Sequence, residues 1–349
     1  MRHAQVLALK CEISLVHVYR LEGMQKAFKT QVEKEGNLTI YRVAYRGKNL
    51  KFIASARATM KAIGLAKKEN GPISRIFLNV FFPLGAHLPW IKKRFKAPIY
   101  ALEHWTGYHQ NNPSYNANHK HLKLARWVSK YCKKVIGVSE DLNQSMKANG
   151  LKNVEGLVYN VVDDSLFKPA DPNTNKSFKW LHISSLKDEH KNFSLLLKSF
   201  AVSQQVGGDT LTVINSGSIE PYKELIKELG ISDKINFTGK LSLEKVAEIM
   251  QACDAFVLSS NYENMPCVIL EALCCGLPIV STDVGGIREV LNDKNGILVP
   301  RGDAIALTKA MTQLHNNKKS YNREEIAVDS VSKFGKQAVL KQFEQALEI

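Results

Sequence analysis

SSNYENMPCVILEALCCGLPIVSTDVGGIREV, residues 259–290, is the most informative part of this sequence of 349 residues. It follows an apolar run typical of a buried strand. Pro266 then stands where a helix begins, a position at which its missing N–H costs nothing. The expected helix ends at Gly276, and residues 279–282 read as a second buried strand before a Gly-Gly turn. Two strand–loop–helix units in succession predict a parallel sheet covered by helices, and therefore an α/β fold.

Two glutamates flank the start of this helix, Glu263 in the preceding loop and Glu271 inside the helix. In parallel sheets, ligands bind at the carboxyl ends of strands, where helix N-termini point their free N–H groups outward. Such amides can hold a diphosphate while the carboxylates accept hydrogen bonds from hydroxyls, which suits a sugar nucleotide. The alternative is two solvated surface acids. Against it, Glu271 lies in an apolar helix, where an unpaired carboxylate is costly.

The two acids with seven residues between them, the apolar helix, residues 276–280 (GLPIV) and the Gly-Gly turn together resemble the signature of a known family. It is that of the retaining glycosyltransferases of family 4 (glycosyl transferases group 1), which have the GT-B fold. The resemblance implies an α/β chain of two doubly wound parallel-sheet, Rossmann-like domains facing a cleft. It also implies transfer of a hexose from a UDP-, GDP- or ADP-sugar to a hydroxyl. The acceptor would be a glycan, such as cell-envelope polysaccharide, or a lipid-linked molecule, and no metal or other cofactor is expected.

The resemblance also assigns roles to residues of this sequence. Glu263 would bind a hydroxyl of the sugar, Lys191 would neutralise charge on the leaving diphosphate, and His104 would lie on the other side of the sugar. A strand-end His is more often structural, and a loop Lys is by default solvated, so both roles depend on the resemblance. The residues expected to bind the donor are Gly217, Asn264, Met265, Cys267, Val268 and Glu271, the last of them through the ribose.

The sequence departs from the family pattern in two places. Members of the family normally carry an Arg where this chain has Ser185, and His190 near its reference pKa of about 6.5 would replace that cation only weakly. Residues 4–10 already read as the end of a helix and 11–20 as the strand after it, so the first domain would lack its first strand. The alternative function is therefore a catalytically impaired or truncated nucleotide-sugar-binding protein of the same fold.

Three segments follow from the same pattern. We expect an acceptor-side domain over residues 1–169, a nucleotide-sugar-binding domain over 170–331, and a terminal helix over 332–349 that packs back toward the first domain. Residues 170–177 are rich in Pro, Asn and Asp and read as the linker. Ser139 is expected to cap a helix in the first domain. An epimerase or a glycogen-type phosphorylase of related fold would carry different site motifs.

Charge is distributed unevenly over a chain of net charge +15, because residues 1–165 hold 27 Lys/Arg against 11 Asp/Glu and residues 166–349 hold 21 against 22. This asymmetry indicates a polyanionic partner for the first half. In residues 87–100 aromatic side chains such as Trp90 alternate with basic ones, which is typical of a helix on an anionic membrane surface. The alternative is a surface helix whose apolar side faces the domain core. Nucleic acid is the less favoured partner.

Location is inferred from what the sequence lacks. No run approaches the length of a transmembrane helix, and the first residues are too short and polar for a secretory signal. The six cysteines show neither CxxC pairs nor metal-ligand spacing, so we expect reduced thiols. We therefore expect a cytoplasmic protein, with peripheral association with the inner face of the cytoplasmic membrane as a hypothesis.

Overall fold

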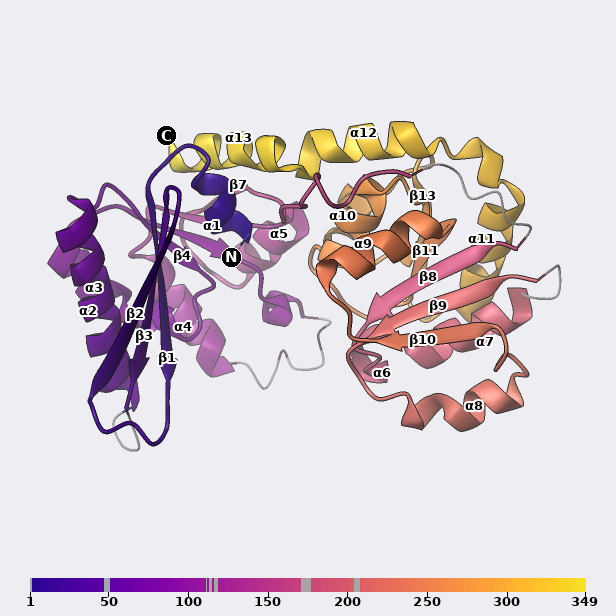
Figure 1. Cartoon of the computed structure of the whole chain (residues 1–349), viewed down its shortest axis with the longest axis horizontal. Coiled ribbons are helices and arrows are strands. Elements are labelled where there is room, and N and C mark those ends of the chain that lie inside the picture. The colour runs from indigo at the N-terminus through magenta and orange to yellow at the C-terminus, as the bar shows by residue number, and fades with distance from the viewer. Residues whose placement is uncertain are drawn as a thin grey trace.

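The computed structural model describes residues 2–46, 51–110, 112, 115, 119–170, 177–203 and 208–349. It shows two lobes side by side, with the last two helices running along both (Figure 1). The N-terminal lobe contains strands β1 to β7 and the C-terminal lobe contains strands β8 to β13. Most of the expected linker, residues 171–176, lies outside the described residues.

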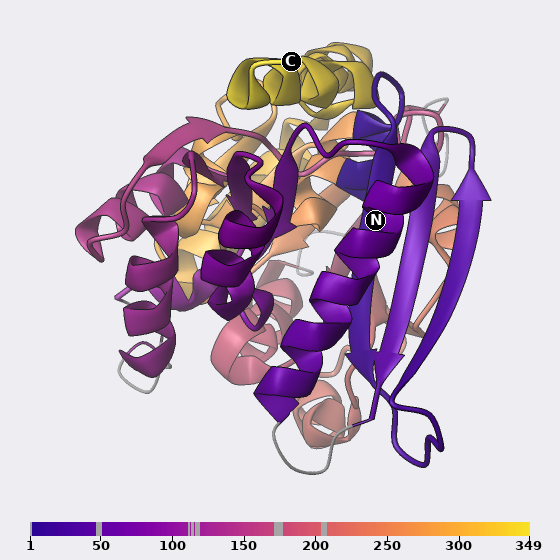
Figure 2. The same ribbon diagram turned by 90° about the vertical axis from the view of Figure 1, so that its left-hand side faces the viewer.

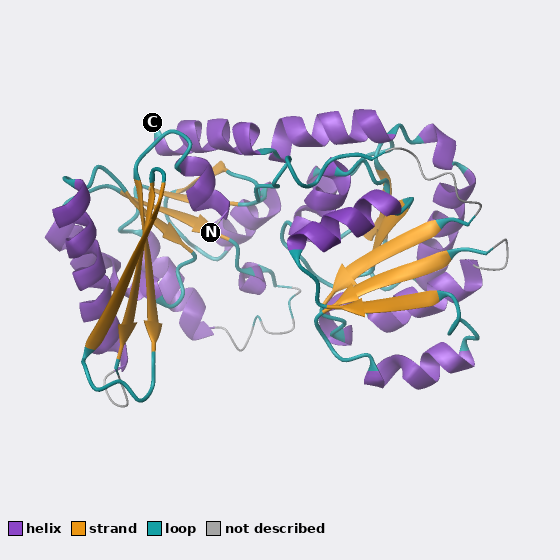
Figure 3. Ribbon diagram, in the orientation of Figure 1, coloured by secondary structure: helices purple, strands orange, loops and turns teal. Residues whose placement is uncertain are grey.

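The C-terminal lobe is built on a six-stranded sheet with the order β10-β9-β8-β11-β12-β13, in which every pair is parallel. Its strands are β8 (Lys179–Ser184), β9 (Thr210–Asn215), β10 (Ile235–Gly239), β11 (Ala255–Leu258), β12 (Ile279–Thr282) and β13 (Gly296–Val299). β11 and β12 are buried throughout, because helices cover both faces of the sheet (Figure 3). Both strands expected from residues 259–290 and the run before them are thus confirmed.

The helices of this lobe that precede β13 connect successive strands, as expected for βα repeats, and the others follow this last strand. They are α6 (Asp188–Lys191), α7 (Phe193–Ser203), η5 (Glu220–Tyr222), α8 (Lys223–Glu228), α9 (Leu243–Ala252), α10 (Cys267–Cys274), η6 (Gly285–Glu289), α11 (Ala304–Asn316) and η7 (Lys318–Ser320). α10 is the apolar helix that the sequence predicts, with Pro266 as its N-cap residue and Gly276 just beyond its end at φ +74°.

The N-terminal lobe has two sheets where the sequence predicts one. A four-stranded parallel sheet has the order β4-β5-β6-β7, and a three-stranded sheet has the order β1-β3-β2. The strands are β1 (Ile13–Arg20), β2 (Phe28–Glu35), β3 (Leu38–Tyr45), β4 (Ile76–Asn79), β5 (Ile99–Glu103), β6 (Lys134–Gly137) and β7 (Val154–Leu157). β1 and β4 each end their sheet, and no described strand is hydrogen-bonded between them. The helix and strand expected at the start, α1 (Arg2–Leu7) and β1, are confirmed.

β2 is a further difference from the sequence-based expectation. It pairs antiparallel with β3 at the edge of its sheet, and most of its residues are exposed. Its sequence FKTQVEKE is mostly polar, so it lacks the apolar signal of a buried strand. Figure 2 shows the three-stranded sheet with the long helix α2 (Lys51–Asn70) lying along it.

The remaining helices of the N-terminal lobe are η1 (Leu84–His87), α3 (Leu88–Phe95), η2 (Thr106–Tyr108), α4 (His119–Ser129) and α5 (Glu140–Ala148). α3 buries Leu88 and Ile91, so its apolar side packs into the lobe, while Trp90 stays 48% exposed. Ser139 caps α5 as expected, since its Oγ accepts the Leu142 N–H at 3.0 Å. In the parts of the chain that the structure describes, no helix combines the length and apolarity needed to span a membrane.

Two helices close the chain where the sequence predicts one. α12 (Arg323–Phe334) packs against α10 of the C-terminal lobe, and α13 (Lys336–Leu347) packs against α1 and β7 of the N-terminal lobe (Figure 1). Gly335 interrupts the helical backbone with φ −66° and ψ 164°, which ends α12 and begins α13. The pair therefore binds to both lobes.

Candidate functional site

Glu263 and Lys191 lie in contact, although 72 residues separate them. Lys191 Nζ donates to the Glu263 carboxylate, Ser260 Oγ donates to the same oxygen at 2.7 Å, and His190 Nε2 lies 3.8 Å from it. Burial would raise the pKa of Glu263, but His190, Lys191 and Ser260 outweigh burial and hold that pKa below its ordinary value. Glu263 is therefore an ionised carboxylate in a buried position.

Backbone contacts fix Lys191 in this place. It ends the short helix α6, and Asn192 follows in a left-handed conformation with φ 48°. Ser259 Oγ donates to the carbonyls of Lys191 and Asn192 at 2.9 and 3.1 Å, and the Asn261 N–H donates to the His190 carbonyl at 2.8 Å. The loops after β8 and β11 are thus joined along their backbones, which brings the cation to the acid.

Asn264 connects this site to the N-terminal lobe. Its Nδ2 donates to the His104 carbonyl at 2.5 Å, and its Oδ1 accepts a hydrogen bond from His109 Nε2 at 2.5 Å. Asn264, which is predicted to bind the donor, is therefore held by His104 at the carboxyl end of β5 and by His109 just after η2. His109 in turn is hydrogen-bonded to Ser145 of α5 at 2.9 Å. None of these pairs is predictable from a local sequence pattern, because all of them join distant segments.

His104 lies at the end of β5, where its carbonyl contacts Asn264 of the C-terminal lobe and its ring contacts residues of the N-terminal lobe. Its Nε2 donates to Asn79 Oδ1 at 2.9 Å, and its ring lies 5.5 Å from that of His3. Burial, and to a smaller extent the nearby His3, lower the pKa of His104 to about 4. The imidazole is therefore neutral at neutral pH, so it is a hydrogen-bonding group here and no source of positive charge.

Glu271 forms an ion pair with Arg2, a partner that the sequence does not predict. Its side chain is 6% exposed, and its carboxylate accepts a hydrogen bond from Arg2 Nη1 at 2.6 Å across the lobes. Burial raises the pKa of Glu271, and Arg2 partly opposes this. The sequence predicts that this buried acid needs a partner but does not identify it, since Arg2 is 269 residues away.

The head of α10 lies between these two acids. Cys267 is its first residue and is exposed, and the amides of Cys267 and Val268 belong to the first turn, where a helix leaves its N–H groups unpaired. Met265 and Asn264 are buried just before it, and the Met265 carbonyl accepts a hydrogen bond from Asn160 Nδ2 at 2.8 Å. Asn264, Met265, Cys267 and Val268, four of the residues that the resemblance assigns to donor binding, therefore lie together at the head of α10.

Gly217 lies at a close backbone approach. A Cβ at this position would lie 1.9 Å from the Ser185 carbonyl oxygen, so no other residue fits without a shift of the loop. Its nearest neighbour is therefore the loop after β8, beside the position where the family normally has Arg.

A second set of interlobe contacts lies at η6. A Cβ on Gly286 would be 2.6 Å from the Ser139 Cβ. The Glu289 carboxylate accepts the N–H groups of Glu140 and Asp141 at 3.0 and 2.8 Å, which caps α5 from the other lobe. A cavity of about 420 Å³ opens here, lined by Glu140, Asp141, Gln144, Asp283, Val284, Gly285, Arg288 and Glu289. No local sequence pattern links η6 to α5, so this contact is not predictable from the sequence.

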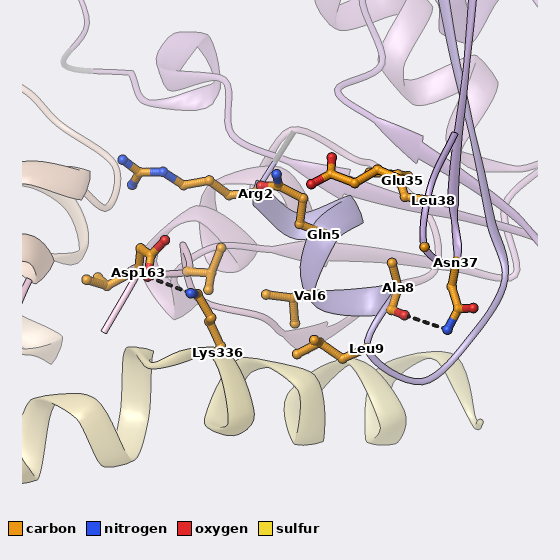
Figure 4. Close-up of a pocket in the computed structure, with 13 residues that line it drawn as sticks. Arg2, Gln5, Val6, Ala8, Leu9, Glu35, Asn37, Leu38, Asp163 and Lys336 are labelled. Carbon is orange, nitrogen blue, oxygen red and sulfur yellow. Dashed lines mark hydrogen bonds and ion pairs between the residues drawn. The ribbon is translucent and has the colours of Figure 1, made fainter. Parts of the chain in front are cut away.

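A larger cavity, of about 580 Å³, lies beside α1 (Figure 4). Its lining comes from α1, the β2–β3 turn, the segment that crosses between the lobes and α13: Arg2, Gln5, Val6, Ala8, Leu9, Glu35, Gly36, Asn37, Leu38, Val161, Val162, Asp163 and Lys336. Within the described ranges, no group of three or more His, Cys, Asp and Glu side chains is arranged to hold a metal ion.

Comparison with known proteins agrees with this architecture. N-acetyl-alpha-D-glucosaminyl L-malate synthase of Bacillus anthracis is 31% identical over 54% of this chain and 51% of its own length, so the chain spans about half of this relative. Sucrose-phosphate synthase of Thermosynechococcus elongatus superposes with a TM-score of 0.79 at 18% identity, over 99% of this chain and 91% of that one. HepE of Anabaena, solved with UDP and glucose, superposes with a TM-score of 0.70 at 17% identity, over 88% of this chain and 86% of that one.

The family comparison concerns the C-terminal lobe, which carries the acids, Lys191 and α10. Residues 165–327 match the family described as glycosyl transferases group 1. The likeness to solved structures extends over both lobes and identifies the fold. The chain therefore has the GT-B fold, and its residues 165–327 form a domain of the glycosyl transferases group 1 family.

Proposed function

We propose that this protein is a retaining glycosyltransferase that moves a hexose from a nucleotide diphosphate sugar to a hydroxyl of a glycan or lipid-linked acceptor. One observation carries the proposal: the ionised, buried Glu263 is held by Lys191 beside the head of α10, and the adjoining Asn264 contacts the opposite lobe. The UDP in the HepE structure supports a nucleotide donor for this fold. A polysaccharide of the cell envelope is the acceptor class that we favour.

In this proposal the donor lies between the lobes. The amides of Cys267 and Val268 hold the diphosphate, and Glu263 accepts a hydrogen bond from a sugar hydroxyl. Lys191 then stays beside the phosphates and stabilises the charge that grows on them as the glycosidic bond breaks, an effect often worth several kcal/mol. The acceptor hydroxyl attacks the sugar on the face from which the diphosphate leaves: its oxygen forms the new glycosidic bond as the bond to the phosphate oxygen breaks, and its proton passes to the leaving phosphate. Lys191 and the helix amides supply the positive charge, so the proposed reaction uses no metal.

Donor screening tests the proposal. Thermal shift with UDP-, GDP- and ADP-sugars should reveal one nucleotide class that stabilises the fold, because a ligand of the folded state raises its apparent stability. The purified chain should then hydrolyse or transfer that sugar in the presence of EDTA. Binding without turnover would favour a nucleotide-sugar-binding protein instead. If none of the three donor classes bound, both the transferase function and the binding function would be contradicted.

The N-terminal lobe exposes aromatic and basic side chains that would suit association with a membrane surface. Phe52 of α2 is 46% exposed and its ring lies 5.5 Å from that of the exposed Trp90 on α3, beside the exposed Lys93 and Arg94. We propose that this surface rests on the anionic inner leaflet of the cytoplasmic membrane, where acceptors are lipid-linked. Sedimentation with vesicles should recover the protein only when they contain anionic lipid. Equal recovery with neutral vesicles, or a preference for nucleic acid, would contradict it.

A further inference from the structure

Arg2 reaches from the N-terminal lobe to the C-terminal lobe. It is the first residue of α1, and its side chain extends from that helix toward the other lobe (Figure 4). The Arg2 side chain is 31% exposed, whereas the Glu271 carboxylate it contacts at 2.6 Å is almost fully buried. The guanidinium therefore has one side on protein and another accessible to a ligand.

The effect of Arg2 on the thiol of Cys267 shows that the guanidinium lies near the head of α10. Although Cys267 reaches the surface, the protein around it removes water from its thiol and, together with the charge of Glu271, raises the thiol pKa to about 11, while the charge of Arg2 acts to lower it. Both charged groups are thus close enough to act on the first residue of the helix. Cys267 and Glu271 are four residues apart and so share one face of α10, with Cys267 one turn nearer the N-terminus.

The charges of the site indicate a use for Arg2. Lys191 and Arg2 are each paired with a buried glutamate, so the two cations and two carboxylates balance in this structure. A diphosphate adds negative charge with each phosphate. When the two cations pair with the phosphates, the two carboxylates accept hydrogen bonds from neutral hydroxyls of the donor instead. The guanidinium offers several donors in a planar fork that suits phosphate oxygens, and the bond to Glu271 uses Nη1 alone.

We propose that Arg2 binds the diphosphate of the donor, opposite Lys191, and in doing so releases Glu271 to accept hydrogen bonds from the ribose. This inference rests on the proposed function. It gives the N-terminal lobe a residue that touches the donor, so that donor binding draws the lobes together. The Arg2–Glu271 pair is then the ligand-free state of the same site.

Binding measurements separate this role from simple neutralisation of Glu271. UDP, GDP and ADP are titrated into the whole protein by calorimetry, with the matching nucleoside as the probe that lacks phosphate. Arg2→Ala should weaken binding of the diphosphate about 10- to 100-fold, the usual effect of losing a charge-assisted hydrogen bond, and should not weaken binding of the nucleoside, whose ribose then finds Glu271 free. Arg2→Lys should recover part of the loss. Lys10→Ala, which removes a cation of the same lobe that pairs with Glu344, is the matched control and should bind as the wild type does.

A second comparison uses the Glu271→Gln background, which lacks the carboxylate that Arg2 neutralises. Arg2→Ala should still weaken diphosphate binding there; an equal affinity with and without Arg2 would show that the residue only balances Glu271. The exposed Cys267 gives an independent readout, because bound diphosphate should slow its alkylation in the wild type. If the wild type bound a nucleoside diphosphate and protected Cys267 while Arg2→Ala bound equally well, the inference alone would fail. If no diphosphate bound the wild type, the proposed function would fail with it.

Discussion

Glu263 and Glu271 show how the same side chain acquires different properties from its neighbours. Both are buried, which raises the pKa of each, but Lys191, His190 and Ser260 reverse the effect at Glu263, whereas Arg2 only reduces it at Glu271. The sequence predicts both acids and Lys191 as members of one site, and the contact between Glu263 and Lys191 agrees with that. It could not predict Arg2, because nothing in the local pattern links α1 to α10.

Replacement of Glu263 tests its proposed role directly. Glu263→Gln keeps the size of the side chain but loses the charge that accepts a sugar hydroxyl, so kcat should fall about 10²- to 10³-fold, as for other positioned electrostatic groups. The measurement is the initial rate of transfer or donor hydrolysis. Glu220→Gln, at an exposed acid paired with Lys223, is the control and should keep the wild-type rate. Wild-type activity in Glu263→Gln would exclude Glu263 from catalysis.

Buried histidines predict the pH dependence of stability. Burial lowers the pKa of His182 to about 4, whereas the unfolded imidazole titrates near 6.5. Between these values the unfolded state binds the proton and the folded state does not, so stability falls as pH drops from about 6.5 toward 4. By pH 5.5 this one residue should cost about 1 kcal/mol of unfolding free energy. Urea titrations at pH 7.5 and 5.5 measure the loss; a flat profile would contradict it.

At the scale of elements, the apolar ones were predictable and the polar ones were not. β11, α10 and β12 were expected from their apolar runs and their Pro and Gly boundaries. β2 escaped prediction because an exposed edge strand needs no apolar pattern, and α12 was missed between two recognised segments. The cap of α5 was only half predictable. Ser139 is local, but the second cap comes from Glu289 of the other lobe.

Removal of this second cap should weaken the attachment of the lobes. Glu289→Ala leaves two N–H groups at the head of α5 without their acceptor, and a lost cap costs about 0.5–2 kcal/mol. The free energy of urea unfolding should fall by that amount. Glu289→Gln keeps one acceptor oxygen for the two N–H groups and should recover only part of the loss. No difference between the two variants and the wild type would mean that water replaces the cap.

At the scale of the whole molecule, the sequence predicts two lobes and their order, but the sheet of the N-terminal lobe divides into two. β1 and β4 pair only with β3 and β5 among the described strands, so the apolar pattern of each strand was correct while their grouping was not. Strand grouping depends on contacts between distant segments, which a local pattern does not contain. The site lies on the surface where the lobes meet, and for that reason its residues are distributed along the whole chain.

The approach of the lobes can be tested at Gly286. A side chain here would place its Cβ 2.6 Å from that of Ser139, so Gly286→Ala should push the lobes apart and misplace the donor. A displacement of this kind should lower kcat/KM about tenfold or more. Gly64→Ala is the control, since nothing lies within 4 Å of its added methyl and Ala favours the helix α2. Equal kcat/KM in both variants would rule out a role for close contact at η6.

The break at Gly335 has a mechanical consequence. The chain passes between the lobes twice, before β8 and at Gly335, and the Val162 N–H donates to the Phe334 carbonyl at 2.9 Å where the passages meet. Lys336 adds an ion pair to Asp163 at 2.5 Å. The two passages therefore form the axis about which the two lobes would rotate relative to each other. A rotation of one lobe about these crossings would stretch first the interlobe hydrogen bonds that lie farthest from them, and would leave the polypeptide at the crossings almost unstrained.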